Sequence, residues 1–183
     1  ALSLAAQGFP SSIVEKEAEL GGNYGQLHYT LEGLDTRRHL AGLREKIESN
    51  DLISVLTGAK IVKMEGFIGN YRTTVATAGS EQDFEHGIVI IATGGYELRT
   101  EEYLYGQMDL VLTQRELESR LAVKDASLTG IKSVVMIQCV GSREADRPYC
   151  SRYCCSQAIK NALKLKEADP AKEVTIIYRD IRT

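Results

Sequence analysis

All four cysteines of the 183-residue chain lie between residues 139 and 155. Ten residues separate Cys139 from Cys150, and three more separate Cys150 from the adjacent pair Cys154 and Cys155. Four thiols are the ligand count of a tetrahedral zinc site or of an iron–sulfur cluster. Because no secretory segment accompanies them, we expect a metal or redox site in a reducing, cytoplasmic setting rather than structural disulfides.

The spacing of these cysteines favours iron over zinc. Zinc sites usually take their ligands from C-x₂₋₄-C units, and two adjacent cysteines chelate one Zn²⁺ awkwardly. The irons of a [4Fe–4S] cube lie at separate corners, so neighbouring cysteines can each bind one. Two other interpretations stay open: a thiol–disulfide oxidoreductase that pairs Cys150 with Cys154 or Cys155, and an interaction module in which zinc holds the four cysteines.

Hydrophobic periodicity and turn residues predict both helices and strands. Helices are expected over residues 1–7, 36–49, 113–122 and 154–168, and strands over 11–17, 52–57, 59–65, 71–77, 87–95, 132–139 and 173–180. Gly8 ends the first helix, and Thr113 with Glu116 forms a capping-box pattern at the start of the third. The helix over 36–49 has an apolar stripe, and Arg44 is expected to face water.

The predicted elements place the cysteines at one end of a βαβ unit. Cys139 ends a strand and Cys154 opens a helix, so the thiols would lie in the crevice where a Rossmann unit binds a pyrophosphate. The partial positive charge of a helix N-terminus favours thiolates and anionic clusters. Arg143 and Arg152 would add positive charge.

Residues in the first half of the chain are placed as in a dinucleotide site. Strand 11–17 contains an acid where Rossmann units bind ribose hydroxyls, and a glycine pair follows it. Strand 87–95 ends in Ala-Thr-Gly, which resembles the second signature of flavoproteins with two dinucleotide-binding domains. There only glycine lets the backbone approach a pyrophosphate closely. We expect FAD to contact seven residues: Glu15, Lys16, Gly21, Gly22, Ala92, Thr93 and Gly94.

The order of the elements predicts an α/β fold of Rossmann-type βαβ units with a small antiparallel β meander between them. This arrangement resembles a fragment of a thioredoxin-reductase-like flavoprotein with two dinucleotide-binding domains. We expect residues 1–124 to form a partial FAD-binding domain that lacks the glycine fingerprint, and residues 125–183 to form a partial second Rossmann-like domain that carries the cysteines.

Seven stretches of the sequence together resemble the A-type subunits of heterodisulfide reductases and their relatives. They are "VEKEAELGGNYGQL", "EGFIGNYRTTV", "VIIATGGYE", "IQCVGSR", "PYCSRYCC", "AIKNALKLKE" and "IIYRDIRT". The resemblance implies an oxidoreductase subunit with FAD and a [4Fe–4S] cluster bound by Cys139, Cys150, Cys154 and Cys155. The resemblance also implies a role in methanogenesis or sulfur metabolism. Such subunits take electrons from ferredoxin-like or hydrogenase-type donors and pass them through flavin. The recipients are the other subunits of a heterodisulfide reductase-type or quinone-interacting complex.

The sequence departs from this family in ways that limit what carries over. No C-x₂-C-x₂-C-x₃-C ferredoxin motif is present, and the glycine fingerprint is missing. We therefore expect an internal fragment that is inactive alone and binds FAD weakly or not at all.

Charge and hydropathy argue against nucleic acid and membranes as partners. The net charge is −3 and basic residues are interspersed with acidic ones, so no nucleic-acid site is expected. The longest apolar run, residues 88–92, is too short to insert into a membrane. The three histidines, His28, His39 and His86, share no metal-ligand spacing.

Overall fold

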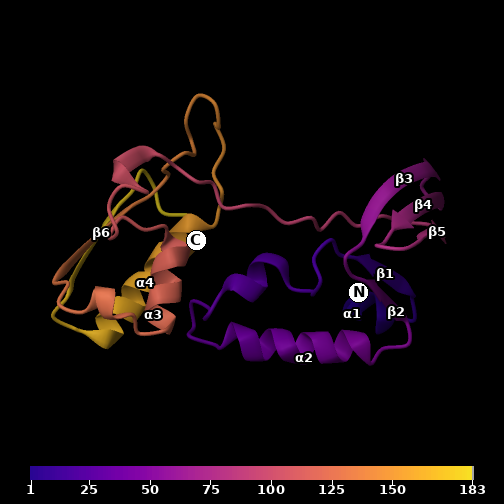
Figure 1. The fold of residues 1–183 in the computed structure, drawn as a ribbon, viewed down its shortest axis with the longest axis horizontal. Helices are drawn as coiled ribbons and strands as arrows, with labels where there is room; N and C mark the ends of the chain where they lie inside the picture. Colours follow the sequence, from indigo (N-terminus) through magenta and orange to yellow (C-terminus); the bar gives the residue numbers. More distant parts are fainter. Residues whose placement is uncertain (183) are drawn as a thin grey trace. The chain divides into compact units, whose positions relative to one another are not determined.

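The computed structural model describes residues 1–182. The chain forms two compact units (Figure 1). Unit 1 contains Ala1–Gln26 and Thr36–Gly95, and unit 2 contains Leu27–Asp35 and the chain from Tyr96 onward. All four cysteines belong to unit 2. The assignment of residues 1–124 and 125–183 to two dinucleotide-binding domains stays a prediction, because compactness does not report what a unit binds.

Unit 1 begins with a small βαβ unit. Helix α1 (Leu2–Ala5) ends before Gly8, whose φ of +82° only glycine adopts readily. Strand β1 (Ser11–Val14) pairs in parallel with β2 (Ile53–Leu56), and helix α2 (Thr36–Glu48) lies between them in the sequence. The strand expected over residues 52–57 is present, but its parallel pairing with β1 was not predicted, because the sequence pattern assigns this strand to the antiparallel meander.

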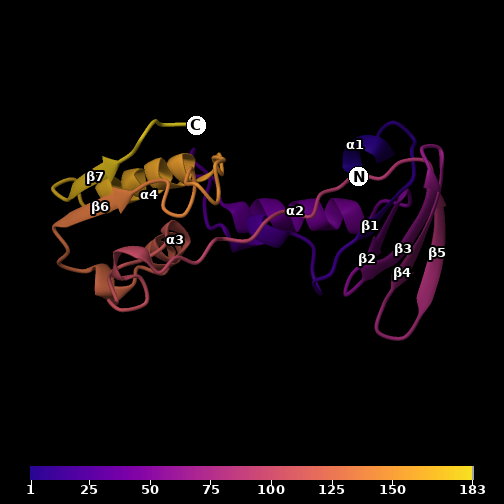
Figure 2. The same cartoon turned by 90° about the horizontal axis from the view of Figure 1, so that it is seen from above.

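The rest of unit 1 is a three-stranded antiparallel sheet, which confirms the predicted meander. Figure 2 shows β3 (Lys60–Phe67), β4 (Asn70–Ala76) and β5 (Glu81–His86) side by side. Strand β5 was not predicted, because it is composed mostly of polar and charged residues. Its pairing with β4 is supported by the hydroxyl of Thr73, 2.8 Å from His86 Nε2, and by Tyr71, which stacks on His86.

The predicted buried strand over residues 87–95 is wrong. These residues contain no strand, and the side chains of Ile88, Ile90 and Ile91 are 76%, 69% and 82% exposed. An apolar run becomes a strand only where a neighbouring strand bonds its backbone and an apolar face covers it. No strand within residues 1–182 pairs with this run.

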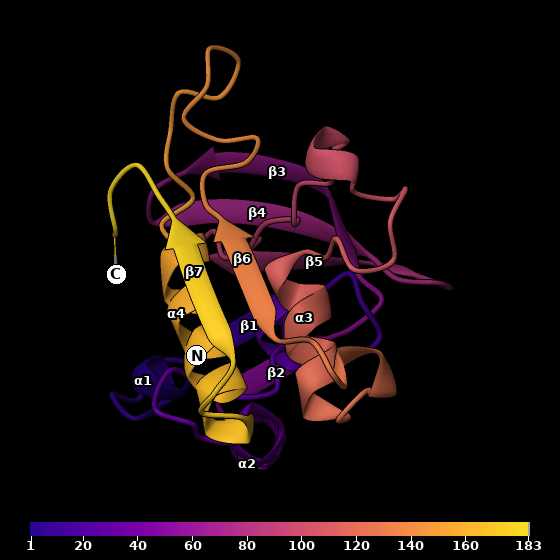
Figure 3. The same ribbon diagram turned by 90° about the vertical axis from the view of Figure 1, so that its left-hand side faces the viewer.

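Unit 2 contains the second βαβ unit. Strand β6 (Ser133–Ile137) pairs in parallel with β7 (Glu173–Ile177), and α4 (Cys154–Ala168) connects them and lies behind both strands in Figure 3. Helix α3 (Gln114–Ala122) packs against α4, and its predicted capping box between Thr113 and Glu116 is confirmed. The core contains Leu117, Met136, Ala158 and Leu165.

The described chain also contains three short 3₁₀ helices, η1 (Gly22–Gln26), η2 (Glu102–Leu104) and η3 (Ala126–Leu128). Among residues 1–182, no helix combines the length and the apolar content that crossing a bilayer requires.

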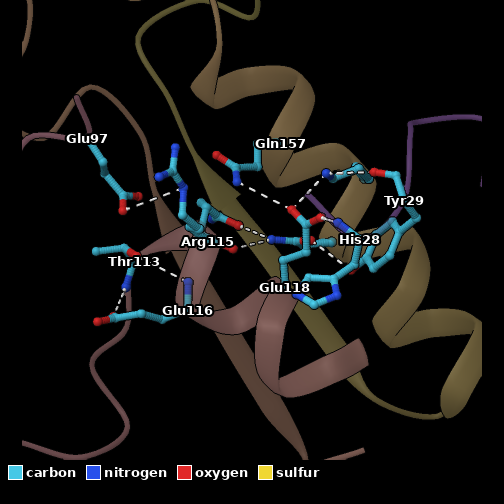
Figure 4. Close-up of polar contacts among 11 residues, drawn as sticks. His28, Tyr29, Glu97, Thr113, Arg115, Glu116, Glu118 and Gln157 are labelled. Carbon is cyan, nitrogen blue, oxygen red and sulfur yellow. Dashed lines mark hydrogen bonds and ion pairs between the residues drawn. The ribbon is translucent and has the colours of Figure 1, made fainter. Parts of the chain in front are cut away.

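A buried ion pair joins the two helices of unit 2 to the segment 27–35 (Figure 4). Lys160 Nζ on α4 lies 2.7 Å from Glu118 Oε2 on α3, and the two side chains are 7% and 1% exposed. The same ammonium group donates to the carbonyl of Tyr29. The other carboxylate oxygen of Glu118 accepts the backbone N–H of His28 at 2.7 Å. Burial and the charge of Glu118 raise the pKa of Tyr29, so its phenol stays protonated and donates to Asn161.

We predict that Lys160→Met lowers the free energy of unfolding by about 3–5 kcal/mol, because it leaves the Glu118 carboxylate buried and unpaired. The double variant Lys160→Met/Glu118→Gln should recover part of this loss, since a neutral amide still accepts the N–H of His28. Urea unfolding of the full chain measures both. Lys164→Met on the same helix is the control, because its pair with Glu167 is exposed and should change stability by less than about 1 kcal/mol. Equal losses in the two single variants would contradict the prediction.

Candidate functional site

The four cysteines lie at the carboxyl end of the parallel pair β6–β7. Cys139 follows β6 and is 7% exposed, and α4 begins at Cys154 as predicted. Cys155 is 3% exposed, whereas Cys150 lies in the connecting loop and is half-buried. In parallel α/β sheets, ligands bind at this end of the strands.

All four thiols are free, and each of the three closest to α4 has a polar contact. The Sγ of Cys150 accepts the backbone N–H of Arg152 at 3.3 Å. The Sγ of Cys154 accepts the hydroxyl of Ser151 at 3.5 Å, and the thiol of Cys155 donates to a backbone carbonyl at residue 180, 3.9 Å away. Two of these contacts are made to residues just before α4, and the third joins Cys155 to the chain after β7.

The donor set fits a cluster in number and type, because four thiolates are what a [4Fe–4S] cluster requires. The geometry of the loop 140–153 does not bring the four together. Within residues 1–182, no group of three or more His, Cys, Asp or Glu side chains is close enough to hold one metal ion. The assignment of Cys139, Cys150, Cys154 and Cys155 as ligands therefore stays a prediction.

Ion pairs connect this loop to the chain that follows β7. Arg143 pairs with Asp180, and Arg179 pairs with Glu144 at 3.2 Å and donates to the carbonyl of Arg143. The positive charge predicted for Arg143 is thus already balanced by a carboxylate. A cavity of about 180 Å³ beside Cys139 is lined in part by Glu144 and Arg179.

The backbone around the cysteines holds unusual conformations. Cys139, Arg143 and Arg152 have φ values of +64°, +59° and +54°, a region that costs ordinary L-residues about 1–2 kcal/mol each. Gly141 also has a positive φ, and a Cβ there would collide with the side chain of Leu98. The surrounding contacts must therefore compensate for this strain, and strained backbone is concentrated at functional sites.

The residues predicted to bind FAD lie in unit 1. Glu15 follows β1, is half-buried, and its carboxylate accepts the backbone N–H of Glu17 at 3.0 Å. Lys16 is exposed and forms an ion pair with Glu17 at 3.6 Å. Ala92 and Thr93 are exposed and lie in a run without helix or strand that precedes Gly94. The role of each in cofactor binding stays a prediction.

Two of the glycine-containing segments meet in unit 1. The side-chain amide of Asn23, directly after Gly22, donates to the carbonyl of Gly95 at 2.7 Å, and Gly94 lies beside the same amide. Arg44 holds the preceding turn by donating to the carbonyl of Leu20 at 2.7 Å. Its side chain is 31% exposed, so Arg44 faces water only in part. Sequence spacing contained no signal for Asn23 or Arg44, because both contacts are made across the fold.

Curated relatives match the chain over its whole length, cysteine region included. The iron-sulfur A-type subunit of the CoB-CoM heterodisulfide reductase of Methanocaldococcus jannaschii is 28% identical over 276 residues, which covers 100% of this chain and 42% of that protein. The chain is similar to the A-type subunits of heterodisulfide reductases. The corresponding subunit of the H(2):CoB-CoM heterodisulfide,ferredoxin reductase of Methanothermobacter thermautotrophicus is 27% identical over 273 residues, with 100% and 41% covered.

A shorter region is more similar still. The A-type subunit of the ferredoxin/F(420)H(2)-dependent CoB-CoM heterodisulfide reductase of Methanosarcina acetivorans is 42% identical over 119 residues, which covers 56% of this chain and 15% of that protein. The predicted resemblance to the A-type subunits of heterodisulfide reductases is therefore confirmed. No protein-family model matches the chain.

The chain spans about two fifths of the length of the relatives that match it throughout. Since 276 aligned residues exceed the 183 of this chain, the M. jannaschii protein contains residues within the aligned region that have no counterpart here. A solved L-proline dehydrogenase from P. horikoshii covers 95% of this chain and 32% of its own, at 15% identity and a TM-score of 0.49, which does not establish a shared fold.

We predict that Gly21→Ala destabilises unit 1. Gly21 has a φ of +133°, which is strained for alanine, and a Cβ would lie 2.8 Å from Leu40 Cδ2, so the leucine side chain would have to move. The expected loss is about 1–3 kcal/mol in the free energy of unfolding, measured in urea on the full chain.

The matched control is Gly42→Ala in the interior of α2, where a Cβ meets nothing within 4 Å. It should stabilise the chain by about 0.5–1 kcal/mol, because alanine favours the helix. If Gly21→Ala were as stable as Gly42→Ala, the turn would not depend on glycine at this position.

Proposed function

We propose that this chain is part of an FAD- and [4Fe–4S]-dependent electron-transfer subunit of a heterodisulfide reductase-type complex. The observation that carries the proposal is the set of four free thiols between the carboxyl end of β6 and the first turn of α4, in a chain similar to an iron-sulfur subunit. In this assignment the protein belongs to an oxidoreductase, and Cys139, Cys150, Cys154 and Cys155 would hold the cluster.

Two features of the cysteine region would favour an anionic cluster. Unpaired N–H groups at the start of α4 stabilise thiolates, and two of the sulfurs already accept hydrogen bonds from Ser151 and Arg152. Cys139 and Cys155 are buried beside the core of unit 2. Cluster binding would therefore require the loop 140–153 to rearrange and bring the four sulfurs together, because no three of them are close enough to share a metal among residues 1–182.

The FAD assignment rests on unit 1. Glu15 at the end of β1 would accept ribose hydroxyls, with Lys16 beside it. Gly21, Gly22 and Gly94 would let the backbone approach the pyrophosphate, together with Ala92 and Thr93. The hydrogen bond from Asn23 to Gly95 supports this assignment, because it joins the two segments that one cofactor would have to contact. When bound, FAD would supply the exchange between two-electron and one-electron steps.

The proposed partners are the other subunits of a heterodisulfide reductase-type or quinone-interacting complex, with ferredoxin-like or hydrogenase-type electron donors. The relative from M. acetivorans belongs to an enzyme described as ferredoxin/F(420)H(2)-dependent, which supports a ferredoxin-like donor. We place the protein in the cytoplasm, because four free thiols persist in a reducing compartment. Methanogenesis or sulfur metabolism is the metabolic setting that we propose.

The test is iron and acid-labile sulfide analysis of protein reconstituted without oxygen, with a visible spectrum. We predict about four irons and four sulfides per chain, as one [4Fe–4S] cluster requires. Cys154→Ala should lose most of this iron, because it removes one ligand at the start of α4. Ser151→Ala, which removes only the hydroxyl bonded to that sulfur, should retain the full iron content.

Two outcomes would contradict the proposal. Stoichiometric zinc without sulfide would favour a zinc-stabilised interaction module. No metal, with a reversible disulfide between Cys150 and Cys154 or Cys155, would favour a thiol–disulfide oxidoreductase.

A further inference from the structure

Gln138 has a buried side-chain amide without a hydrogen-bond partner. The residue is 7% exposed, and neither its Nε2 nor its Oε1 is bonded to any described residue. An unsatisfied buried amide costs about 1–3 kcal/mol per group. Gln157 is equally buried at 6%, but its Nε2 donates to Glu118. The side-chain amide of Gln138 is therefore a buried hydrogen-bond donor and acceptor, neither of which has a partner among the described residues.

The strand pattern fixes the direction in which Gln138 points. Its backbone N–H donates to the carbonyl of Ile177 at 2.9 Å, so the β6–β7 ladder continues through it. Side chains alternate between the faces of a strand. Val134 and Met136 belong to the core on the inner face, and Val135 is exposed on the outer face. Gln138 is thus the next inward residue, at the carboxyl end of the strand.

Cys155 lies in the first turn of α4, which follows the loop after the carboxyl end of β6. Ala158 packs in the core with Met136, and Cys155 lies three residues earlier on the stripe shared with Ala162 and Leu165. Figure 3 shows that α4 begins at the end of the sheet where the strand arrows point. From the core cluster that contains Met136 and Ala158, the next inward residue toward that end is Gln138 on β6, and the next residue of the buried stripe of α4 is Cys155.

From this juxtaposition we propose that Gln138 Nε2 donates a hydrogen bond to the Sγ of Cys155 when that sulfur is a cluster ligand. The inference rests on the proposed function. A hydrogen bond to a ligand sulfur stabilises the reduced, more negative cluster and raises its reduction potential. The amide is neutral, so it supplies this donor without burying another charge. Gln138 is a positioning and tuning residue, and no step of electron transfer requires it to react.

The test compares reduction potentials in EPR-monitored titrations of the reconstituted full chain. Gln138→Leu removes both N–H donors at similar volume and should lower the potential by about 59 mV, which is a tenfold shift of a one-electron equilibrium. Its iron content should match the unsubstituted chain. Gln138→Met, a flexible side chain without a donor, provides a second variant if Gln138→Leu folds poorly and should show the same shift.

Gln157→Leu is the matched control. It removes an equally buried amide from α4, but one already bonded to Glu118, so stability should fall while the potential stays unchanged. An unchanged potential in fully loaded Gln138→Leu or Gln138→Met would overturn the inference and leave the proposed function standing. An equal shift in Gln157→Leu would also overturn it, since the effect would then be general loosening of α4. An unsubstituted chain that takes up no iron would overturn both proposals.

Discussion

The buried ion pair between Glu118 and Lys160 is the interaction on which the packing of unit 2 depends. It joins α3 to α4 and, through His28 and Tyr29, brings in the distant segment 27–35 of the sequence. Because two charges removed from water must satisfy each other, few placements of α4 against α3 are allowed. The pair therefore restricts the helix whose first turn contains Cys154 and Cys155.

In contrast to the satisfied ion pair, the cysteine region contains strained backbone and an unsatisfied buried amide. Beyond the ends of β6 and β7, the chain contains left-handed residues at Cys139, Arg143 and Arg152, a polar cavity and a buried amide without a partner. A fold optimised only for stability would satisfy Gln138 and relax these backbone conformations. Two of the four cysteines, Cys139 and Cys155, are buried, and Cys150 and Cys154 are half-buried, so the site would have to be completed by the group that binds there.

Local signals made most of the fold predictable from the sequence. The capping box at Thr113, the glycine stop at Gly8 and the start of α4 at Cys154 each depend on neighbours within a few residues. Strand β5 and the exposed run at 88–92 were mispredicted, because a strand depends on partners that periodicity does not reveal. For the same reason, the sequence did not predict the contacts of Arg44 and Asn23 or the burial of Gln138. It also did not predict the ion pair between Glu118 and Lys160. The sequence was enough to select the four cysteines as candidate ligands. It did not predict that their sulfurs lie too far apart for three of them to share a metal among residues 1–182.

Native mass spectrometry with cysteine alkylation, on the full chain reconstituted without oxygen, tests the central claim most directly. The account predicts one species heavier by a single [4Fe–4S] cluster, in which Cys139, Cys150, Cys154 and Cys155 are all protected from alkylation and become reactive when the cluster is removed. A chain that carries a cluster while one or more of these thiols stays reactive would contradict the four-cysteine site. A chain that carries zinc, or no added mass, would contradict the electron-transfer account itself.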